Sequence, residues 1–171
     1  AILNGLSVSG AGTLAVTAST GAQSITATAA TLNVATGDGD DTLIVGDAAN
    51  ITTADEINLG NGSGDAIQVM ADDDSTGAVF DEAGHAGVET ITVLASTTAA
   101  TENVKLSLNY AAANTNALTI NASALTNSSA EFTLALAGTT ANVDNALTVV
   151  GGAGNDTITT GDGADTITAG D

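Results

Sequence analysis

The sequence contains no cysteine, no proline and no tryptophan, and its aromatic residues are two phenylalanines and one tyrosine. Without cysteine the chain has no disulfides, no thiolate metal ligands and no cysteine nucleophile. A single lysine, Lys105, and no arginine stand against twenty acidic residues, which gives a formal net charge of −19. Such a chain cannot displace counterions from a nucleic acid or dock on anionic lipid headgroups. We therefore expect no nucleic-acid partner and no membrane insertion.

Hydrophobic residues make up 43% of the chain, which is enough for folding in spite of the charge. No apolar run approaches the length of a membrane span, and no charged segment followed by an apolar one marks a signal peptide. The apolar residues are mostly small or β-branched, which suits a thin core between closely spaced strands. Because the chain opens at Ala1 without methionine and closes at Asp171 within a repeat, we expect it to be a piece of a longer protein.

Apolar–polar–apolar triplets recur along the chain, and each predicts a short β-strand. They lie at residues 6–8, 14–16, 25–27, 32–34, 57–59, 67–69, 91–93, 106–108, 118–120, 132–134 and 147–149. The alanine-rich segments 111–113 and 122–125 predict no more than a helical turn. An antiparallel sandwich and a parallel solenoid both fit short strands at this spacing. The lack of proline and the scarcity of aromatic residues favour an all-β, right-handed parallel β-solenoid, or β-roll.

Three glycine-rich segments carry a repeat. Residues 151–159 (GGAGNDTIT) match the nonapeptide G-G-x-G-x-D-x-U-x, in which U is aliphatic. Residues 160–168 and 36–44 follow the same pattern without its first glycine, and 60–67 is a degenerate copy. Glycines let such a turn adopt positive φ and expose its carbonyl oxygens, and calcium takes about six to eight oxygens. One turn offers half of that number, so a second turn stacked on it would complete the site and tie two rungs together.

We therefore predict Ca²⁺, and no other cofactor, at these turns. The predicted ligand-bearing residues are Gly37, Asp38, Gly39, Asp41, Asp65, Gly151, Gly154, Asp156, Gly161, Asp162, Gly163 and Asp165. The alternative for each aspartate is a solvated turn. Asp47 and Asp171 are weaker candidates, and 72–74 is interpreted as an exposed acidic loop. We expect the turn at 151–156 to pair with the one that begins at Ala169, about 18 residues later.

The nonapeptides resemble those of RTX proteins of Gram-negative bacteria. From about Leu32 onward, the layout of turns and Ala/Thr-rich strands resembles the calcium-dependent RTX surface-layer proteins. This resemblance implies a β-solenoid, secretion through a one-step channel with an uncleaved C-terminal signal, and calcium-driven lattice assembly. It suggests three segments: a solenoid at 1–70 with calcium turns at 36–47 and 60–67, an Ala/Thr-rich continuation at 71–150, and RTX repeats at 151–171.

We accordingly expect a structural, self-assembling building block of a bacterial surface layer or extracellular filament, located outside the cell. Its partner would be itself, with any cell-surface polysaccharide anchor elsewhere in the parent chain. The alternatives are a calcium-folded spacer of a large RTX adhesin and, less favoured, the C-terminal roll of a secreted enzyme. His85 is the single histidine and is expected in a loop without an orienting partner, so no catalytic residue is predicted. Lys105 is expected to be an exposed charge on a strand.

Overall fold

The strands of the molecule run parallel throughout its described part. The computed structural model describes residues 4–17, 20–71, 77–81, 85–96, 102–109, 117–136 and 146–170. Within them every strand pair is parallel, and the strands form one ten-stranded and one four-stranded sheet. This confirms the predicted all-β parallel solenoid. No helix in the described ranges is long and apolar enough to cross a membrane.

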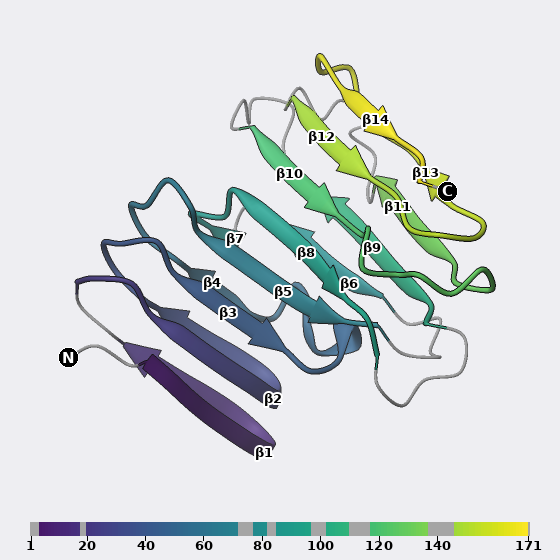
Figure 1. The fold of residues 1–171 in the computed structure, drawn as a ribbon. Helices are drawn as coiled ribbons and strands as arrows, with labels where there is room; N and C mark the ends of the chain where they lie inside the picture. The colour runs from purple at the N-terminus through teal and green to yellow at the C-terminus, as the bar shows by residue number, and fades with distance from the viewer. Residues whose placement is uncertain are drawn as a thin grey trace.

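One wall of the solenoid, here called wall A, faces the viewer in Figure 1. From the N-terminal to the C-terminal end it consists of β1 (Asn4–Thr17), β2 (Ser24–Ala35), β3 (Thr42–Val45), β5 (Ala66–Met70), β8 (Thr90–Leu94), β10 (Leu118–Asn121), β12 (Leu147–Val150) and β14 (Thr166–Thr168). The strands stack in register, so that Ile25, Leu43 and Ile67 occupy equivalent positions. Each successive strand of this wall therefore begins one further rung of the solenoid.

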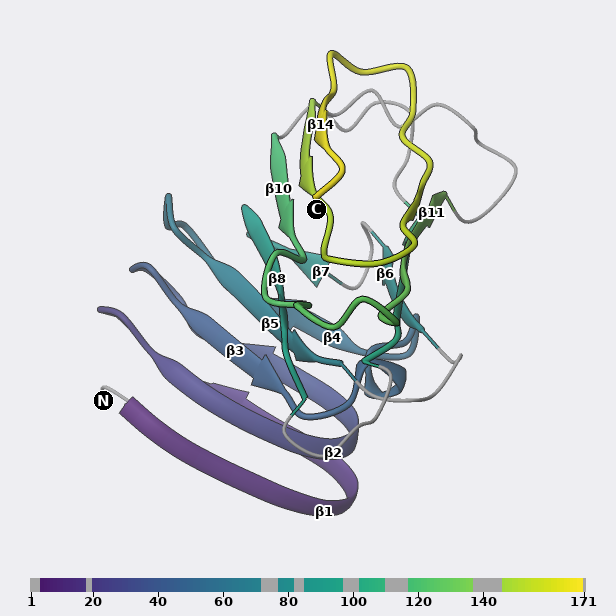
Figure 2. The same ribbon diagram turned by 45° about the vertical axis from the view of Figure 1, so that its right-hand side comes forward.

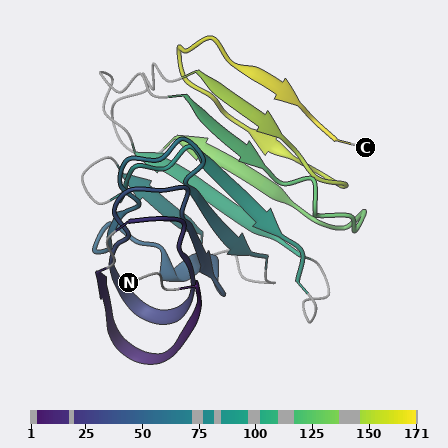
Figure 3. The same cartoon turned by 60° about the vertical axis from the view of Figure 1, so that its left-hand side comes forward.

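Two shorter ladders close the solenoid behind wall A. The second half of β2 continues into wall B, which consists of β4 (Glu56–Asn58) and β7 (His85–Ala86). Wall C is the four-stranded sheet of β6 (Ala78–Asp81), β9 (Val104–Asn109), β11 (Phe132–Leu136) and β13 (Thr157–Ile158). Figure 2 shows these ladders behind wall A, and Figure 3 shows β1 and β2 bending as continuous U-shaped ribbons. In the next rung the 3₁₀ helix η1 (Ala48–Asn50) replaces that bend.

The core is a column of aliphatic residues between the walls. The side chains of β5 alternate between buried and half-buried, as do those of β8. Every second residue of these strands therefore faces the core, and the residues between them face outward. Phe80 and Phe132 are fully buried in wall C and supply the largest side chains of this core. Ile167 on β14 is 49% exposed, in contrast to the buried aliphatic residues at the same register position.

The predicted triplets lie within strands, except that the last residue of 57–59 lies beyond the end of β4. Segments 6–8 and 14–16 belong to one long strand, as do 25–27 and 32–34, because the chain bends there without a turn. Segment 122–125 forms one turn, closed by the Leu125 N–H donating to the Ala122 carbonyl at 3.0 Å. Segment 111–113 lies outside the described residues. Lys105 is exposed on β9 as predicted, whereas the prediction of a loop for His85 is wrong, since it lies buried in β7.

Candidate calcium-binding turns

The predicted calcium residues lie along two opposite edges of the solenoid. Turns that lead into wall A form the first edge: 20–23, 36–41, 60–65, 87–89 and 159–165. Turns that leave wall A form the second edge: 46–55, 122–131, 151–156 and 169–170. Each nonapeptide contributes one turn and one strand, so the consecutive copies 151–159 and 160–168 place their turns on opposite edges.

On the first edge the turn at 36–41 packs directly against the turn at 60–65. Parallel bridges join Asp38 to Thr20 on one side and to Asn61 on the other. A Cβ at Gly60 would run into the Gly37 carbonyl, and Gly60 has a φ of 93°. The nonapeptide copy and its degenerate neighbour therefore occupy successive rungs, with glycine backbones in contact.

A column of carboxylates runs along this edge, directly before the strands of wall A. The Gln23 N–H donates to Asp41 Oδ1 at 2.7 Å, and the Asp41 N–H donates to Asp65 Oδ1 at 2.7 Å. The Asp65 N–H in turn donates to Glu89 Oε2 at 2.9 Å. Sequence reasoning missed Glu89. The signal was present, because Glu89, Thr90 and Ile91 repeat the acid–x–aliphatic order of a nonapeptide.

Asp41 and Asp65 are both buried, and their carboxylates differ in one contact. Asp65 Oδ2 accepts the Gly62 N–H at 3.1 Å, whereas Asp41 Oδ2 is buried with no hydrogen-bond partner among the described residues. Burial raises the pKa of Asp65, the charges of Glu89 and Asp41 raise it further, and the two N–H donors act against this. A buried carboxylate oxygen without a partner is costly, and a cation beside it would remove that cost.

On the second edge the turn at 151–156 meets the turn that begins at Ala169, as predicted. The Gly151 N–H donates to the Thr168 carbonyl at 2.8 Å. A Cβ at Gly151 would run into both the Ala169 carbonyl oxygen and Asp156 Oδ2. Asp156 Oδ1 is buried and has no hydrogen-bond partner in the described part of the chain. Burial raises the pKa of Asp156, although backbone N–H groups of neighbouring residues oppose the shift.

The turn at 160–165 lies beside no other acidic turn in the described structure. Its preceding turn on the first edge falls within 137–145, outside the described residues. Asp165 Oδ1 accepts the Leu147 N–H at 2.9 Å, and Asp162 is exposed. Asp38 is exposed as well and accepts a hydrogen bond from Asn61 Nδ2 at 3.2 Å.

The expectation of positive φ at the motif glycines holds in part. Gly37, Gly39 and Gly154 have φ values of 95°, 129° and 103°, whereas Gly161 and Gly163 adopt no positive φ. Glycine at 151 is needed for a different reason, since the oxygens of the adjoining rung and of its own turn leave no room for a side chain.

Asp47, a weaker candidate, and Asp55, which was not predicted as a ligand, have structural contacts that use their carboxylate oxygens. Asp47 Oδ1 accepts the Ala49 N–H at 2.8 Å and so caps η1. Asp55 is buried, and its two oxygens accept the Leu32 N–H at 2.8 Å and the Thr52 N–H at 2.6 Å. Asp171 and the acidic segment 72–74 lie outside the described residues.

The donor atoms of these turns suit calcium. Among the described residues, no group of three or more His, Cys, Asp or Glu side chains is arranged to hold a metal. An ion there would draw on carbonyl oxygens as well as carboxylates, which is the donor set that calcium prefers. At Gly62 a Cβ would lie 2.6 and 2.7 Å from the two Asp65 oxygens and would run into the Gly39 carbonyl oxygen. Oxygens from two successive rungs therefore converge here, and the residues fit Ca²⁺.

Replacing Asp156 by alanine should remove about one bound calcium ion. The substitution deletes a carboxylate with an unpartnered buried oxygen, and the 36–41 turn on the other edge should be unaffected. Asp55→Ala is the matched control, because both oxygens of Asp55 are already used by N–H groups. It should cost about 2–4 kcal/mol of stability and no calcium. Equilibrium dialysis with metal analysis measures the ion count. Equal calcium loss in the two variants would show that Asp156 is not a ligand.

Comparison with known proteins bears on the C-terminal turns. The family model for the RTX calcium-binding nonapeptide repeat (four copies) matches residues 148–171, and its range does not include the copy at 36–44. No curated protein and no solved structure gives a significant match. Repeats of this kind bind Ca²⁺ and are typical of secreted bacterial proteins. The chain therefore contains RTX calcium-binding repeats at the turns 151–156 and 160–165.

Proposed function

We propose that this chain is a calcium-dependent, self-assembling structural module of a bacterial surface layer or extracellular filament, and that it has no catalytic activity. The observation that carries the proposal is the stack of glycine–aspartate turns, in which Asp41 and Asp156 each keep a buried carboxylate oxygen without a partner among the described residues. A cation shared by two turns would tie successive rungs together. The solenoid would then be rigid enough to assemble into a layer or filament only when calcium is bound.

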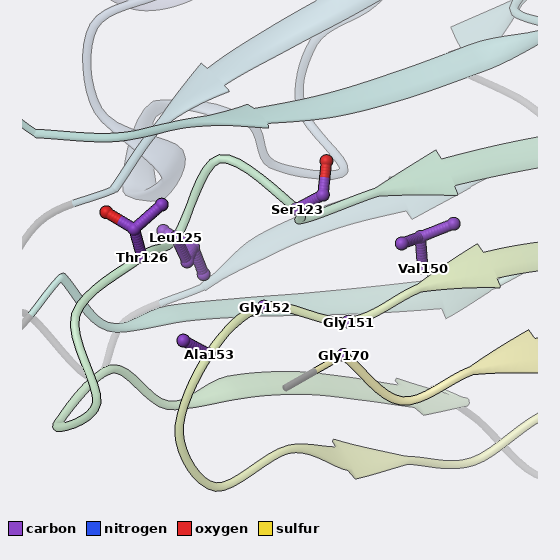
Figure 4. Close-up of a pocket in the computed structure, with 8 residues that line it drawn as sticks. All are labelled: Ser123, Leu125, Thr126, Val150, Gly151, Gly152, Ala153 and Gly170. Carbon is purple, nitrogen blue, oxygen red and sulfur yellow. The ribbon is translucent and has the colours of Figure 1, made fainter.

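The surroundings of the nonapeptide turn support a non-catalytic role. A pocket of about 250 Å³ lies beside it, between the rung of β10 and the glycines of the next rung (Figure 4). It is lined by Ser123, Leu125, Thr126, Val150, Gly151, Gly152, Ala153 and Gly170. None of these side chains can act as a general acid or base at neutral pH. His85 packs its ring against Phe80 at a centroid distance of 5.5 Å, in a buried position.

The charge of the chain supports control of assembly by calcium. A net charge of −19 keeps separate copies apart at neutral pH. The strand-preceding acids lie in the edge turns, which are the places where calcium would neutralise them. Bound calcium would therefore reduce repulsion between copies at the same time as it stiffens each copy.

Electron microscopy and analytical ultracentrifugation, each with and without calcium, test this proposal. We expect ordered sheets or filaments in millimolar calcium, and a monomer in the presence of a chelator. A monomer in calcium at all protein concentrations, with its β-structure intact by circular dichroism, would overturn self-assembly and favour the adhesin spacer.

A further inference from the structure

The outer face of wall A carries no charged side chain from β2 to β14. Its outward positions include a column of threonines that stack in register from strand to strand, among them Thr90, Thr119, Thr148 and Thr166. These side chains are half-buried or exposed, and in the first three strands the next residue along the chain is buried in the core. Figure 1 looks onto this face, and no described segment crosses in front of it.

Apolar side chains accompany the threonines on the same face. Ile44, Met70, Leu94 and Val150 occupy outward positions and remain partly exposed. The other two walls differ, because Glu56 is exposed on wall B and Lys105 on wall C. Soluble domains are designed with charged residues at about a quarter to a third of their surface. In a chain with twenty acidic residues, an extended wall without charge therefore points to a partner rather than to water.

We propose that the outer face of wall A docks on the same face of a second copy of this chain. The inference rests on the proposed self-assembly and names its contact surface. Two copies of a protein with charge −19 repel each other wherever their acids meet, and among the described walls this one brings no charge to the contact. Threonine methyl groups and the aliphatic side chains supply apolar contact between two sheets about 10 Å apart.

The size of the face sets the strength of this contact. Seven strands spaced about 4.8 Å apart, each with about five residues of 3.3 Å, cover about 30 Å by 15 Å. A face of about 450 Å² is smaller than the roughly 800 Å² per partner of a standard stable interface. One such contact is therefore weak, and it becomes lasting when many copies are held in an array.

Placing one negative charge on the wall tests the proposal. Thr119→Glu puts a carboxylate at an exposed outward position of β10, so that two docked copies bring like charges together. Thr133→Glu is the matched control on wall C, where the new carboxylate lies in register with Lys105 of the neighbouring strand. Self-association of the two variants and the unmodified chain is measured in saturating calcium by ultracentrifugation. Circular dichroism checks folding, and Thr92→Glu replaces Thr119→Glu if the latter does not fold.

We expect Thr119→Glu to weaken self-association by about tenfold or more, with partial recovery at high salt because salt screens the repulsion. Thr133→Glu should associate like the unmodified chain. If Thr119→Glu associates normally, the docking surface is wrong while the proposed assembly stands. If Thr119→Glu self-associates normally but no longer binds an insoluble neutral polysaccharide, the face binds a glycan and the proposed docking of two copies is wrong. An unmodified chain that stays monomeric in calcium overturns both proposals.

Discussion

Removing calcium with a chelator should abolish most of the β-structure of this protein. Extracellular calcium modules bind with Kd of about 10⁻⁴–10⁻³ M, so each site adds about 0.4–1.4 kcal/mol at millimolar calcium. Several sites together amount to a large part of the roughly 5–15 kcal/mol that stabilises a typical domain. Circular dichroism should show a loss of strand signal in chelator and its return with calcium, but not with the same concentration of magnesium. An unchanged strand signal in chelator would contradict the role of calcium as a clamp between rungs.

The effect of acid tests whether the charges of buried carboxylates cause the loss of structure without calcium. The pKa values of Asp65 and Asp156 are raised in the folded chain, first by burial. Such groups stabilise the fold when they are protonated, below their unfolded pKa of about 3.8, and this stability is lost as the pH rises through the folded pKa. Without calcium, the structure that remains should therefore melt at a higher temperature in mild acid than at neutral pH. With calcium the order should reverse, since protons compete with the ion for carboxylates. Asp65→Asn should weaken the pH dependence, and greater stability at neutral pH in chelator would refute this account.

Gly60→Ala should be among the most destabilising single substitutions in the chain. Gly60 has a φ of 93°, and its new Cβ would run into the carbonyl group of Gly37 on the adjoining rung. Because the clashing atoms are backbone, no change of side-chain rotamer can relieve the contact, so the rungs of Gly37 and Gly60 must move apart. We expect a loss of about 2–4 kcal/mol, from left-handed strain of about 1 kcal/mol and overpacking of about 1–3 kcal/mol. Denaturant unfolding in saturating calcium measures this loss.

Gly5→Ala separates the two contributions. Gly5 also has a positive φ, 75°, but a Cβ there would have no atom within 4 Å. This variant should lose about 1 kcal/mol, which is the conformational strain alone. Equal losses in the two variants would mean that contact between the rungs contributes nothing to the cost at Gly60.

Local patterns in the sequence were sufficient to predict the strands of wall A and the stacking of its turns. The apolar–polar–apolar order of segments such as 67–69 indicates which residues face inward. This order can be recognised within each strand alone. The nonapeptide spacing also predicted that 151–156 would meet Ala169, because two nonapeptides make one rung when nothing is inserted. Here the repeat length itself determines which residues become neighbours.

The back of the solenoid could not be predicted in the same way. Rungs with insertions use extra residues, as the rung between Asp41 and Asp65 does for η1 and for β4 of wall B, and their course depends on which side chains the core accepts. His85 illustrates this, because a histidine between alanine and glycine has no local signal for burial against Phe80. The capping contacts of Asp55 depend on Leu32 in another rung, so the sequence around Asp55 did not indicate them.

The acids that precede strands give the solenoid a polarity. Asp41 accepts the N–H of Gln23, Asp55 that of Leu32, Asp65 that of Asp41, Glu89 that of Asp65, and Asp165 that of Leu147. In each of these bonds the carboxylate belongs to the later rung and the amide to the earlier one. Loss of one of these five acids thus leaves an amide of the rung on its N-terminal side without that partner. Like the subunits of a polar filament, the rungs linked by these bonds are chemically directional: each offers an amide toward its C-terminal neighbour and a carboxylate toward its N-terminal neighbour.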